Sequence, residues 1–346
     1  MKRQLYISGL SKLGDYIKDF LANDPLQQNE KFSDFNSIIR KSEIDNPWFT
    51  EENQKYALNE WATLLNEENL SEWLQDYRFS ETPKKIGLVL AGNIPLVGFH
   101  DVICTVLSGN IAVIKPSSKD KIMIPFLLKK WNEFSKPLPI PFEIVEKLTD
   151  YDAVIATGSN NTARYLEYYF KNSLSLIRKN RTSVAVLSGE ETDEEIRALA
   201  NDIFRYFGLG CRNVTRIFIP KNFLLERLFE NFMDFQEVIH HHKYANNYDY
   251  NRAIYLLNQE KFWDNNFVLL KEDEKLFSPL AVLHFSRYEQ TDEVHQFIKE
   301  NEENIQCIVA QPQLGISNSI NMGNAQKPSL STYADNVDTM RFLEAI

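Results

Sequence analysis

The first eighty residues of the chain have the hydrophobic pattern of helices. Over residues 10–20 the apolar side chains recur every three or four positions, a spacing that places them on one face of a helix. They are Leu10, Leu13, Tyr16, Ile17 and Phe20. Trp61, Leu64 and Leu65 continue the pattern, and Trp73 and Leu74 follow after a polar stretch. We therefore expect a helical N-terminal arm over residues 1–80, and its sequence shows no catalytic chemistry.

From residue 86 the pattern changes to short apolar runs that are separated by helical stretches. The runs are 86–90, 111–114 and 153–156, and each is followed by small or polar residues. Continuous apolar runs joined by helical crossovers are typical of buried parallel strands. Sheets of this kind bind ligands at the carboxyl ends of their strands. We therefore expect a dinucleotide-binding α/β domain over residues 81–180.

A second group of α/β elements begins at residue 181. The pattern predicts strands over 183–187 and 215–219, with a helix over 192–207 between them. Acidic residues in the first turn of that helix suit its dipole. No linker marks the border near residue 180, so the border follows from the order of the strands. We expect a catalytic domain over 181–311 and a C-terminal segment, 312–346, that returns to the cofactor domain or forms an interface.

Composition and charge narrow the class of protein. A chain of 346 residues is long enough for two lobes, because single hydrophobic cores stop growing at about 250–300 residues. The net charge of −10 argues against a nucleic-acid partner, which needs an excess of Lys and Arg. The apolar segment 95–114 contains His100, Asp101 and Asn110, so we expect no membrane span. Three separated cysteines fit a reducing compartment, and we expect a soluble, cytoplasmic protein.

Cys211 is the most suggestive single residue. Gly208 and Gly210 allow a sharp turn before it, and Arg212 places a cation beside it. A neighbouring cation lowers the pKa of a thiol and increases its nucleophilic thiolate fraction. The local sequence fits a buried structural cysteine equally well, since free cysteines are often buried. Cys104 and Cys307 lie in apolar stretches, where core packing is the better interpretation.

Other polar residues follow the predicted strands. Asn93 could donate to an oxyanion, although alone it is better read as a turn residue. Lys115, with Ser117 and Ser118, could contact a ribose or phosphate, or could simply end a strand. The turn at Gly158 and Ser159 could present N–H groups to a pyrophosphate, but it lacks a recognised phosphate-binding motif. Three successive histidines, 240–242, point in different directions, so we expect no metal site.

Taken together, these pieces resemble the aldehyde dehydrogenase superfamily, and most closely its LuxC-type acyl-CoA reductase branch. The resemblance rests on four segments in order, and it is good over residues 85–225. The segments are 90–95 (LAGNIP), 109–118 (GNIAVIKPSS), 157–159 (TGS) and 207–211 (FGLGC), the last followed by 216–220 (RIFIP). It implies an aldehyde dehydrogenase-like fold with two α/β domains, parallel sheets and a helical N-terminal arm.

The resemblance also implies roles for residues at matching positions. Cys211 corresponds to the nucleophile, and Asn93 with the Cys211 backbone N–H corresponds to the oxyanion hole. The remaining matches imply contacts with the cofactor: ribose contacts at Lys115, Ser117 and Ser118, a pyrophosphate turn at Gly158 and Ser159, and further contacts at Leu90, Ala91 and Gly92. NAD-preferring relatives often have Glu at the position of Ser118, where a carboxylate repels a 2′-phosphate, so we expect NADPH.

The chain departs from the oxidising relatives in two places, of which the first bears on the direction of the reaction and the second on a cofactor contact. Those relatives carry a glutamate that activates water in the stretch matching 176–181, which here has no carboxylate. They also carry a glutamate for the nicotinamide ribose in the stretch matching 275–279, which here is KLFSP. Without a base for hydrolysis, an acyl-cysteine is expected to be reduced or transferred to another thiol. The resemblance therefore implies reduction of a long-chain acyl-CoA or other acyl thioester to the aldehyde.

Two other classes of function stay open from the sequence. One is an acyl-phosphate reductase or aldehyde-oxidising member of the superfamily, and the other is a non-catalytic nucleotide-binding subunit of a complex. As partners, the resemblance implies a homo-oligomer and a protein that transfers the acyl group.

Overall fold

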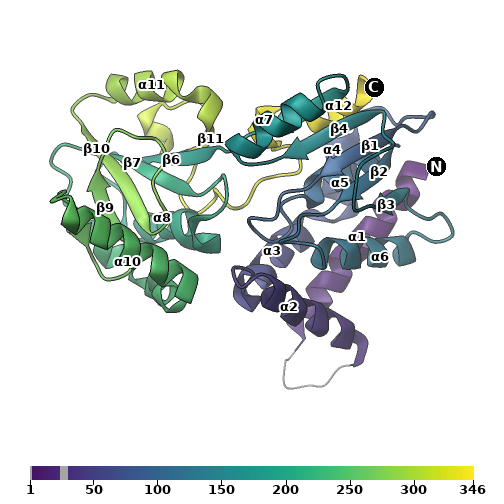
Figure 1. The fold of residues 1–346 in the computed structure, drawn as a ribbon, viewed down its shortest axis with the longest axis horizontal. Helices are drawn as coiled ribbons and strands as arrows, with labels where there is room; N and C mark the ends of the chain where they lie inside the picture. The colour runs from purple at the N-terminus through teal and green to yellow at the C-terminus, as the bar shows by residue number, and fades with distance from the viewer. Residues whose placement is uncertain (1, 24–29) are drawn as a thin grey trace. The chain divides into compact units, whose positions relative to one another are not determined.

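The computed structural model describes residues 2–23 and 30–346 and divides them into two compact units. The first unit contains residues up to 179 together with 329–346, and the second contains residues 180–328. Figure 1 shows the elements of each unit. None of the helices in these described ranges is long and apolar enough to cross a membrane.

The N-terminal part of the first unit is helical, as its apolar spacing predicted. Its helices are α1 (Lys2–Ala22), α2 (Ser33–Asp45), α3 (Glu51–Leu64) and α4 (Glu67–Leu74), with a short 3-10 turn, η1 (Glu30–Phe32), before α2. Leu10, Leu13 and Ile17 form part of the buried face of α1. That face packs on α3 and on α6 (Met123–Phe134), so the helices cover the sheet domain that follows them in sequence.

The first sheet is entirely parallel and has the order β3-β2-β1-β4-β5. Its strands are β1 (Lys85–Val89), β2 (Ile111–Lys115), β3 (Phe142–Ile144), β4 (Ala153–Thr157) and β5 (Leu174–Arg178). The crossover helices are α5 (Phe99–Leu107) between β1 and β2, α6 between β2 and β3, and α7 (Asn160–Tyr169) between β4 and β5. The three predicted strands are confirmed as β1, β2 and β4. The chain reverses its winding at β1, which pairs with both β2 and β4.

The C-terminal residues 329–346 belong to the first unit and include α12 (Thr339–Glu344). A buried ion pair anchors them: Arg178, at the end of β5, contacts Asp101 of α5 at 2.6 Å and donates to the Thr339 hydroxyl at 2.8 Å. Tyr333 accepts from the indole N–H of Trp73 at 2.8 Å. The end of the chain is therefore tied to α4, α5 and β5 by buried polar contacts.

The second sheet has the order β12-β11-β6-β7-β10-β9-β8. Its strands are β6 (Thr182–Val186), β7 (Val214–Pro220), β8 (Trp263–Asp264), β9 (Leu269–Glu272), β10 (Val282–Tyr288), β11 (Ile305–Ala310) and β12 (Ser319–Ile320). The accompanying helices are α8 (Asp193–Phe204), α9 (Glu226–Phe232), α10 (His242–Leu257) and α11 (Thr291–Glu300), with short 3-10 turns η2 (Arg205–Gly208), η3 (Met233–His240), η4 (Glu302–Asn304), η5 (Pro312–Leu314) and, in the first unit, η6 (Ala334–Asn336).

This second sheet is parallel apart from β8, which runs antiparallel to β9. The tight turn between them explains the exception, because a short connection joins only antiparallel strands. Asn266 in that turn has a φ of 73°, and its N–H donates to the Asp264 carboxylate at 2.8 Å. The two predicted strands, 183–187 and 215–219, are confirmed as β6 and β7.

Candidate functional site

The strand ends of the first unit bring the expected cofactor segments to one edge. Val89 at the end of β1 lies opposite Lys115 of β2 and Ala156 of β4 in the sheet register. The N–H of Leu90 donates to the carbonyl of Lys115 at 3.2 Å. The segments after these three strands, which carry Asn93, Ser117 and Gly158, therefore start side by side at the carboxyl edge of the sheet, the edge where such sheets bind ligands.

Gly92 lets two of these segments touch. A Cβ atom at position 92 would lie 2.5 Å from the Ser117 Oγ and 2.7 Å from the Ser117 Cβ. The Ser117 hydroxyl in turn accepts from the backbone N–H of Lys119 at 3.2 Å. Asn93 and Ser118, the neighbours of this contact, are exposed. Only glycine fits at position 92. The backbone of Gly92 therefore lies next to the exposed residues Asn93 and Ser118.

The segment after β4 leads into the N-terminus of α7. Ser159 caps the helix, and its hydroxyl accepts from the Thr162 N–H at 3.2 Å. Gly158 packs against the first turn, since a Cβ there would lie 2.8 Å from the Thr162 methyl group. The N-terminus of a helix attracts anions through its unpaired N–H groups and its dipole. Half-buried Lys115 ends β2, which β1 separates from β4 in the same sheet, and together these residues are the candidates to hold a dinucleotide phosphate and ribose.

Asp120 is a residue of this edge that sequence reasoning missed. Its side chain is buried, and its Oδ2 accepts from the N–H of Leu96 at 3.1 Å. Leu96 has a φ of 61°, a left-handed conformation that is costly for leucine. Burial raises the pKa of Asp120 to about 6. Asp120 therefore holds the segment that carries Asn93, although in sequence it looks like one more charge in a solvated loop.

In the second unit, the helix before Cys211 is shorter than the sequence predicted. The predicted helix reaches residue 207, whereas α8 ends at Phe204 and the 3-10 turn η2 follows. Tyr206, Phe207 and Gly208 have φ values of 56°, 57° and 77°. The sharp turn before Cys211 is therefore made by two buried aromatic residues and one glycine in left-handed conformations.

Arg212 contacts the segment after β12. Its Nε donates to the carbonyl of Ala325. Asp202 of α8 accepts from the N–H groups of Gly323 at 2.6 Å and Ala325 at 2.9 Å. Burial raises the pKa of Asp202 to about 7, and the charge of Arg212 opposes part of that rise. Arg212 and Asp202 thus both bind the 323–325 segment, and through Arg212 the loop of the half-buried Cys211 is tied to the chain after β12.

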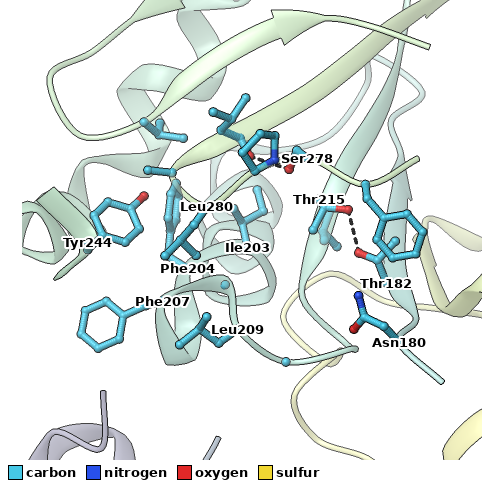
Figure 2. Close-up of a pocket in the computed structure, with 18 of the residues that line it drawn as sticks. Asn180, Thr182, Ile203, Phe204, Phe207, Leu209, Thr215, Tyr244, Ser278 and Leu280 are labelled. Atoms are coloured by element: carbon cyan, nitrogen blue, oxygen red, sulfur yellow. Dashed lines mark hydrogen bonds between the residues drawn. The ribbon is translucent and has the colours of Figure 1, made fainter. Parts of the chain in front are cut away.

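A cavity of about 240 Å³ lies beside this loop within the second unit. Figure 2 shows its walls, which include Phe204, Phe207, Leu209, Tyr244 and Leu280. Parts of three segments that the sequence singled out (176–181, 207–211 and 275–279) meet at it, namely residues 180–181, 207–210 and 277–279. Asp, Glu and His are absent from the described residues that line it.

The other two cysteines have different surroundings. Cys104 is buried in α5, and burial raises the pKa of its thiol well above the ordinary value. Cys307 is half-buried on β11, lies 3.0 Å from the Ser183 hydroxyl, and also has its pKa raised by burial. Within the part of the chain that the structure describes, no group of three or more His, Cys, Asp or Glu residues could hold a metal ion.

The fold is that of aldehyde dehydrogenases. A mutant of aldehyde dehydrogenase C from Pseudomonas syringae, solved with NAD+ and octanal, matches with a TM-score of 0.62 at 14% identity, over 90% of this chain and 73% of that one. An NAD-dependent benzaldehyde dehydrogenase from Corynebacterium glutamicum matches with a TM-score of 0.65 at 12% identity, over 94% and 83%. An oxidoreductase from Marinobacter aquaeolei matches with a TM-score of 0.62 at 10% identity, over 99% and 84%.

Sequence comparison identifies the branch of this superfamily. None of the curated proteins matches the sequence. The family model described as acyl-CoA reductase (LuxC) matches residues 55–228, about half of the chain, which include the Asn93, Lys115, Ser159 and Cys211 segments. The match confirms the family resemblance seen in the sequence: the chain belongs to the acyl-CoA reductase (LuxC) family, whose members are oxidoreductases of acyl groups and aldehydes.

Proposed function

We propose that this protein reduces a fatty acyl-CoA, or another acyl thioester, to the aldehyde with NADPH through an acyl group bound to Cys211. The family match supports the reaction class. The observation that carries the proposal is the Cys211 loop, which Arg212 ties to the segment after β12 and whose residue Gly210, directly before Cys211, lines a cavity with both polar and apolar walls. A thiol held in such a place is suited to accept an acyl group.

The proposed reaction uses the thiolate of Cys211, its backbone N–H and the side chain of Asn93. The Cys211 thiolate attacks the thioester carbonyl carbon, a new C–S bond forms, and coenzyme A leaves as the thiolate. Asn93 and the Cys211 N–H stabilise the oxyanion of the tetrahedral intermediate. Loss of coenzyme A leaves an acyl-cysteine, and bound NADPH would supply a hydride to its carbonyl carbon, which gives the thiohemiacetal. The thiohemiacetal on Cys211 then loses the aldehyde and regenerates the thiolate.

The surroundings of the cavity support reduction rather than hydrolysis. A hydrolytic enzyme needs a general base that can activate water at the acyl-cysteine. The described residues that line the cavity include no carboxylate and no histidine, and the stretch 176–181 has no carboxylate either. Water that reaches the acyl group would therefore find no base in these two places.

The carboxyl edge of the first sheet supports the cofactor part of the proposal. Lys115, Ser117 and Ser118 follow β2, and Gly158 and Ser159 lead into the N-terminus of α7. We place the adenosine ribose at the first group and the pyrophosphate at the second, with Leu90, Ala91 and Gly92 contacting the cofactor between them. Two similar folds are solved with NAD+, a P. syringae enzyme and an indole-3-acetaldehyde dehydrogenase, and the former also holds octanal, an aldehyde with an alkyl chain. On this proposal residues 81–180 form the cofactor domain and 181–311 the catalytic domain.

The test is to trap the acyl-enzyme. The protein is incubated with a long-chain acyl-CoA without NADPH, and the intact mass and the peptides are measured. We expect one acyl group on Cys211, and we expect Cys211→Ala to lose at least three powers of ten in turnover. Cys104→Ala is the matched control, because Cys104 is buried in the first unit. Acylation at Cys104 or Cys307, or undiminished turnover in Cys211→Ala, would overturn the proposal, and a non-catalytic subunit would oxidise no NADPH with any acyl-CoA.

A further inference from the structure

We propose that Asn213 is the positioning residue for Cys211, since it clamps the peptide groups on the N-terminal side of the nucleophile. This inference rests on the proposed function, which gives Cys211 the role of the nucleophile. Asn213 is fully buried in the second unit. Its side chain and its backbone both bind Gly210, the residue directly before Cys211.

The side chain of Asn213 makes hydrogen bonds in two directions. Its Oδ1 accepts from the N–H of Gly210 at 2.7 Å. Its Nδ2 donates to the carbonyls of Asp202 at 3.1 Å, Ile203 at 3.2 Å and Arg205 at 2.9 Å. The last carbonyls of a helix have no partner within the helix. Asn213 therefore caps α8 from outside the helix and connects its end to the nucleophile loop.

The clamp explains how the chain tolerates the turn before Cys211. Tyr206 and Phe207 hold left-handed conformations, which persist only where the surrounding structure over-determines them. The Asn213 amide binds both ends of this turn, at the carbonyl of Arg205 on one side and the N–H of Gly210 on the other. Because one planar amide reaches both sides, the turn has little freedom to relax to an ordinary conformation.

The backbone of Asn213 orients the proposed oxyanion donor. Its N–H donates to the carbonyl of Gly210 at 3.1 Å. That carbonyl and the Cys211 N–H belong to one planar peptide group and point in opposite directions. Fixing the Gly210 carbonyl therefore fixes the direction of the Cys211 N–H, the group that we assign to the oxyanion.

The far side of Cys211 is fixed by the neighbouring strand. The Ser183 hydroxyl of β6 donates to the Cys211 carbonyl at 3.1 Å, and the Ser183 N–H donates to the Asn213 carbonyl at 3.1 Å. The peptide groups before and after Cys211 are thus both fixed, because the Gly210 carbonyl accepts from Asn213 and the Cys211 carbonyl accepts from Ser183. A buried amide with these contacts acts through Cys211 and needs no contact with the substrate.

The experiment compares Asn213→Ala with Asn231→Ala. Asn231 is also a buried asparagine of the second unit, and it donates to the Arg227 carbonyl at 2.9 Å, away from the Cys211 loop. For both variants we measure the melting temperature, the kcat and KM of acyl-CoA reduction, and the rate of Cys211 alkylation by iodoacetamide as a function of pH. Peptide mass spectrometry separates Cys211 from Cys104 and Cys307.

We expect Asn213→Ala to lower kcat about 10- to 100-fold with a change in KM of less than about threefold, because a misplaced oxyanion donor acts on the transition state. We also expect a changed pH profile of Cys211 alkylation. Asn231→Ala is expected to lower the melting temperature and to leave both the kcat and the alkylation profile near wild type. An Asn213→Ala variant that loses only thermal stability would overturn the inference.

A measurement on the wild-type protein covers the case in which Asn213→Ala does not fold. The Gly210 N–H donates to a buried amide, so its hydrogen exchange should be as slow as that of the neighbouring strands β6 and β7. Fast exchange at Gly210 would overturn the clamp. The proposed function fails separately, through full activity of Cys211→Ala, and neither the alkylation profile nor the exchange rate depends on that activity.

Discussion

The contact between Gly92 and Ser117 leads to a prediction whose size follows from the structure. In Gly92→Ala the new methyl group would lie 2.5 Å from the Ser117 Oγ and 2.7 Å from its Cβ. Ordinary van der Waals contact begins at 3.4 Å, so the segments after β1 and β2 must separate by about 0.7–0.9 Å. Overpacking of this kind costs about 1–3 kcal/mol. The separation also moves Asn93 relative to Lys115, so we expect weaker NADPH binding.

Stability and binding are measured on the same variants. Four of the five tryptophans, Trp48, Trp61, Trp73 and Trp131, lie in the first unit, so urea unfolding followed by tryptophan fluorescence reports mainly on that unit. The matched variant is Gly92→Ala with Ser117→Gly, which removes the two nearest atoms that the methyl group would meet and leaves only the backbone nitrogen of Asp120 at 3.2 Å. We expect Gly92→Ala to lower the free energy of unfolding much less in the Ser117→Gly background than in the wild-type protein.

Two results would refute this reasoning. Wild-type stability in Gly92→Ala would show that the two segments are not in contact. The double variant could also lose as much free energy of unfolding as the two single variants lose together. That result would show that Ser117 is not the group that excludes a side chain at position 92. In either case, the close approach of these segments would no longer support the placement of the cofactor.

The remaining predictions concern the acyl group, the cofactor and pH. Hydrolysis of acyl-CoA without NADPH should be slow compared with reduction, and free fatty acid released as fast as aldehyde would reveal a general base outside the cavity lining. Ser118→Glu should shift the ratio of kcat/KM toward NADH, because a carboxylate repels a 2′-phosphate; an unchanged ratio would show that position 118 does not contact the ribose. Burial raises the pKa of Asp202 to about 7 in the folded protein, against an ordinary value of 3.8. Between about pH 4 and 7 the folded protein therefore keeps a proton that the unfolded chain has lost. Stability should therefore fall as the pH rises through this window, and calorimetry should find a weaker dependence in Asp202→Asn.

The sequence predicted the parts of the fold that repeat in a regular way. Apolar runs such as 86–90 and 153–156 became parallel strands, because a strand that is covered on both faces must be apolar throughout. The helical spacing of Leu10, Leu13 and Ile17 likewise became the buried face of α1. These elements follow from local patterns, which a single sequence contains in full.

Features that depend on contacts between distant residues were not predicted. The helix over 192–207 ends early as α8, because the amide of Asn213 binds the carbonyls at its end and the chain then turns left-handed at Tyr206. The antiparallel strand β8 is too short to show a period. Asp101 and Arg178 form a buried ion pair across 77 positions of sequence, and no local pattern indicates that these two residues pair.

Both candidate site loops use the same kind of support. In the first unit a buried acid, Asp120, accepts from the left-handed Leu96 in the segment that carries Asn93. In the second unit a buried amide, Asn213, accepts from Gly210 beside Cys211. Each polar side chain satisfies backbone groups that would otherwise be buried without partners, and each lies outside the glycine-containing segment that carries the family resemblance. A chain could therefore keep the segments 90–95 and 207–211 intact and still misplace Asn93 or Cys211 through a single change at Asp120 or Asn213.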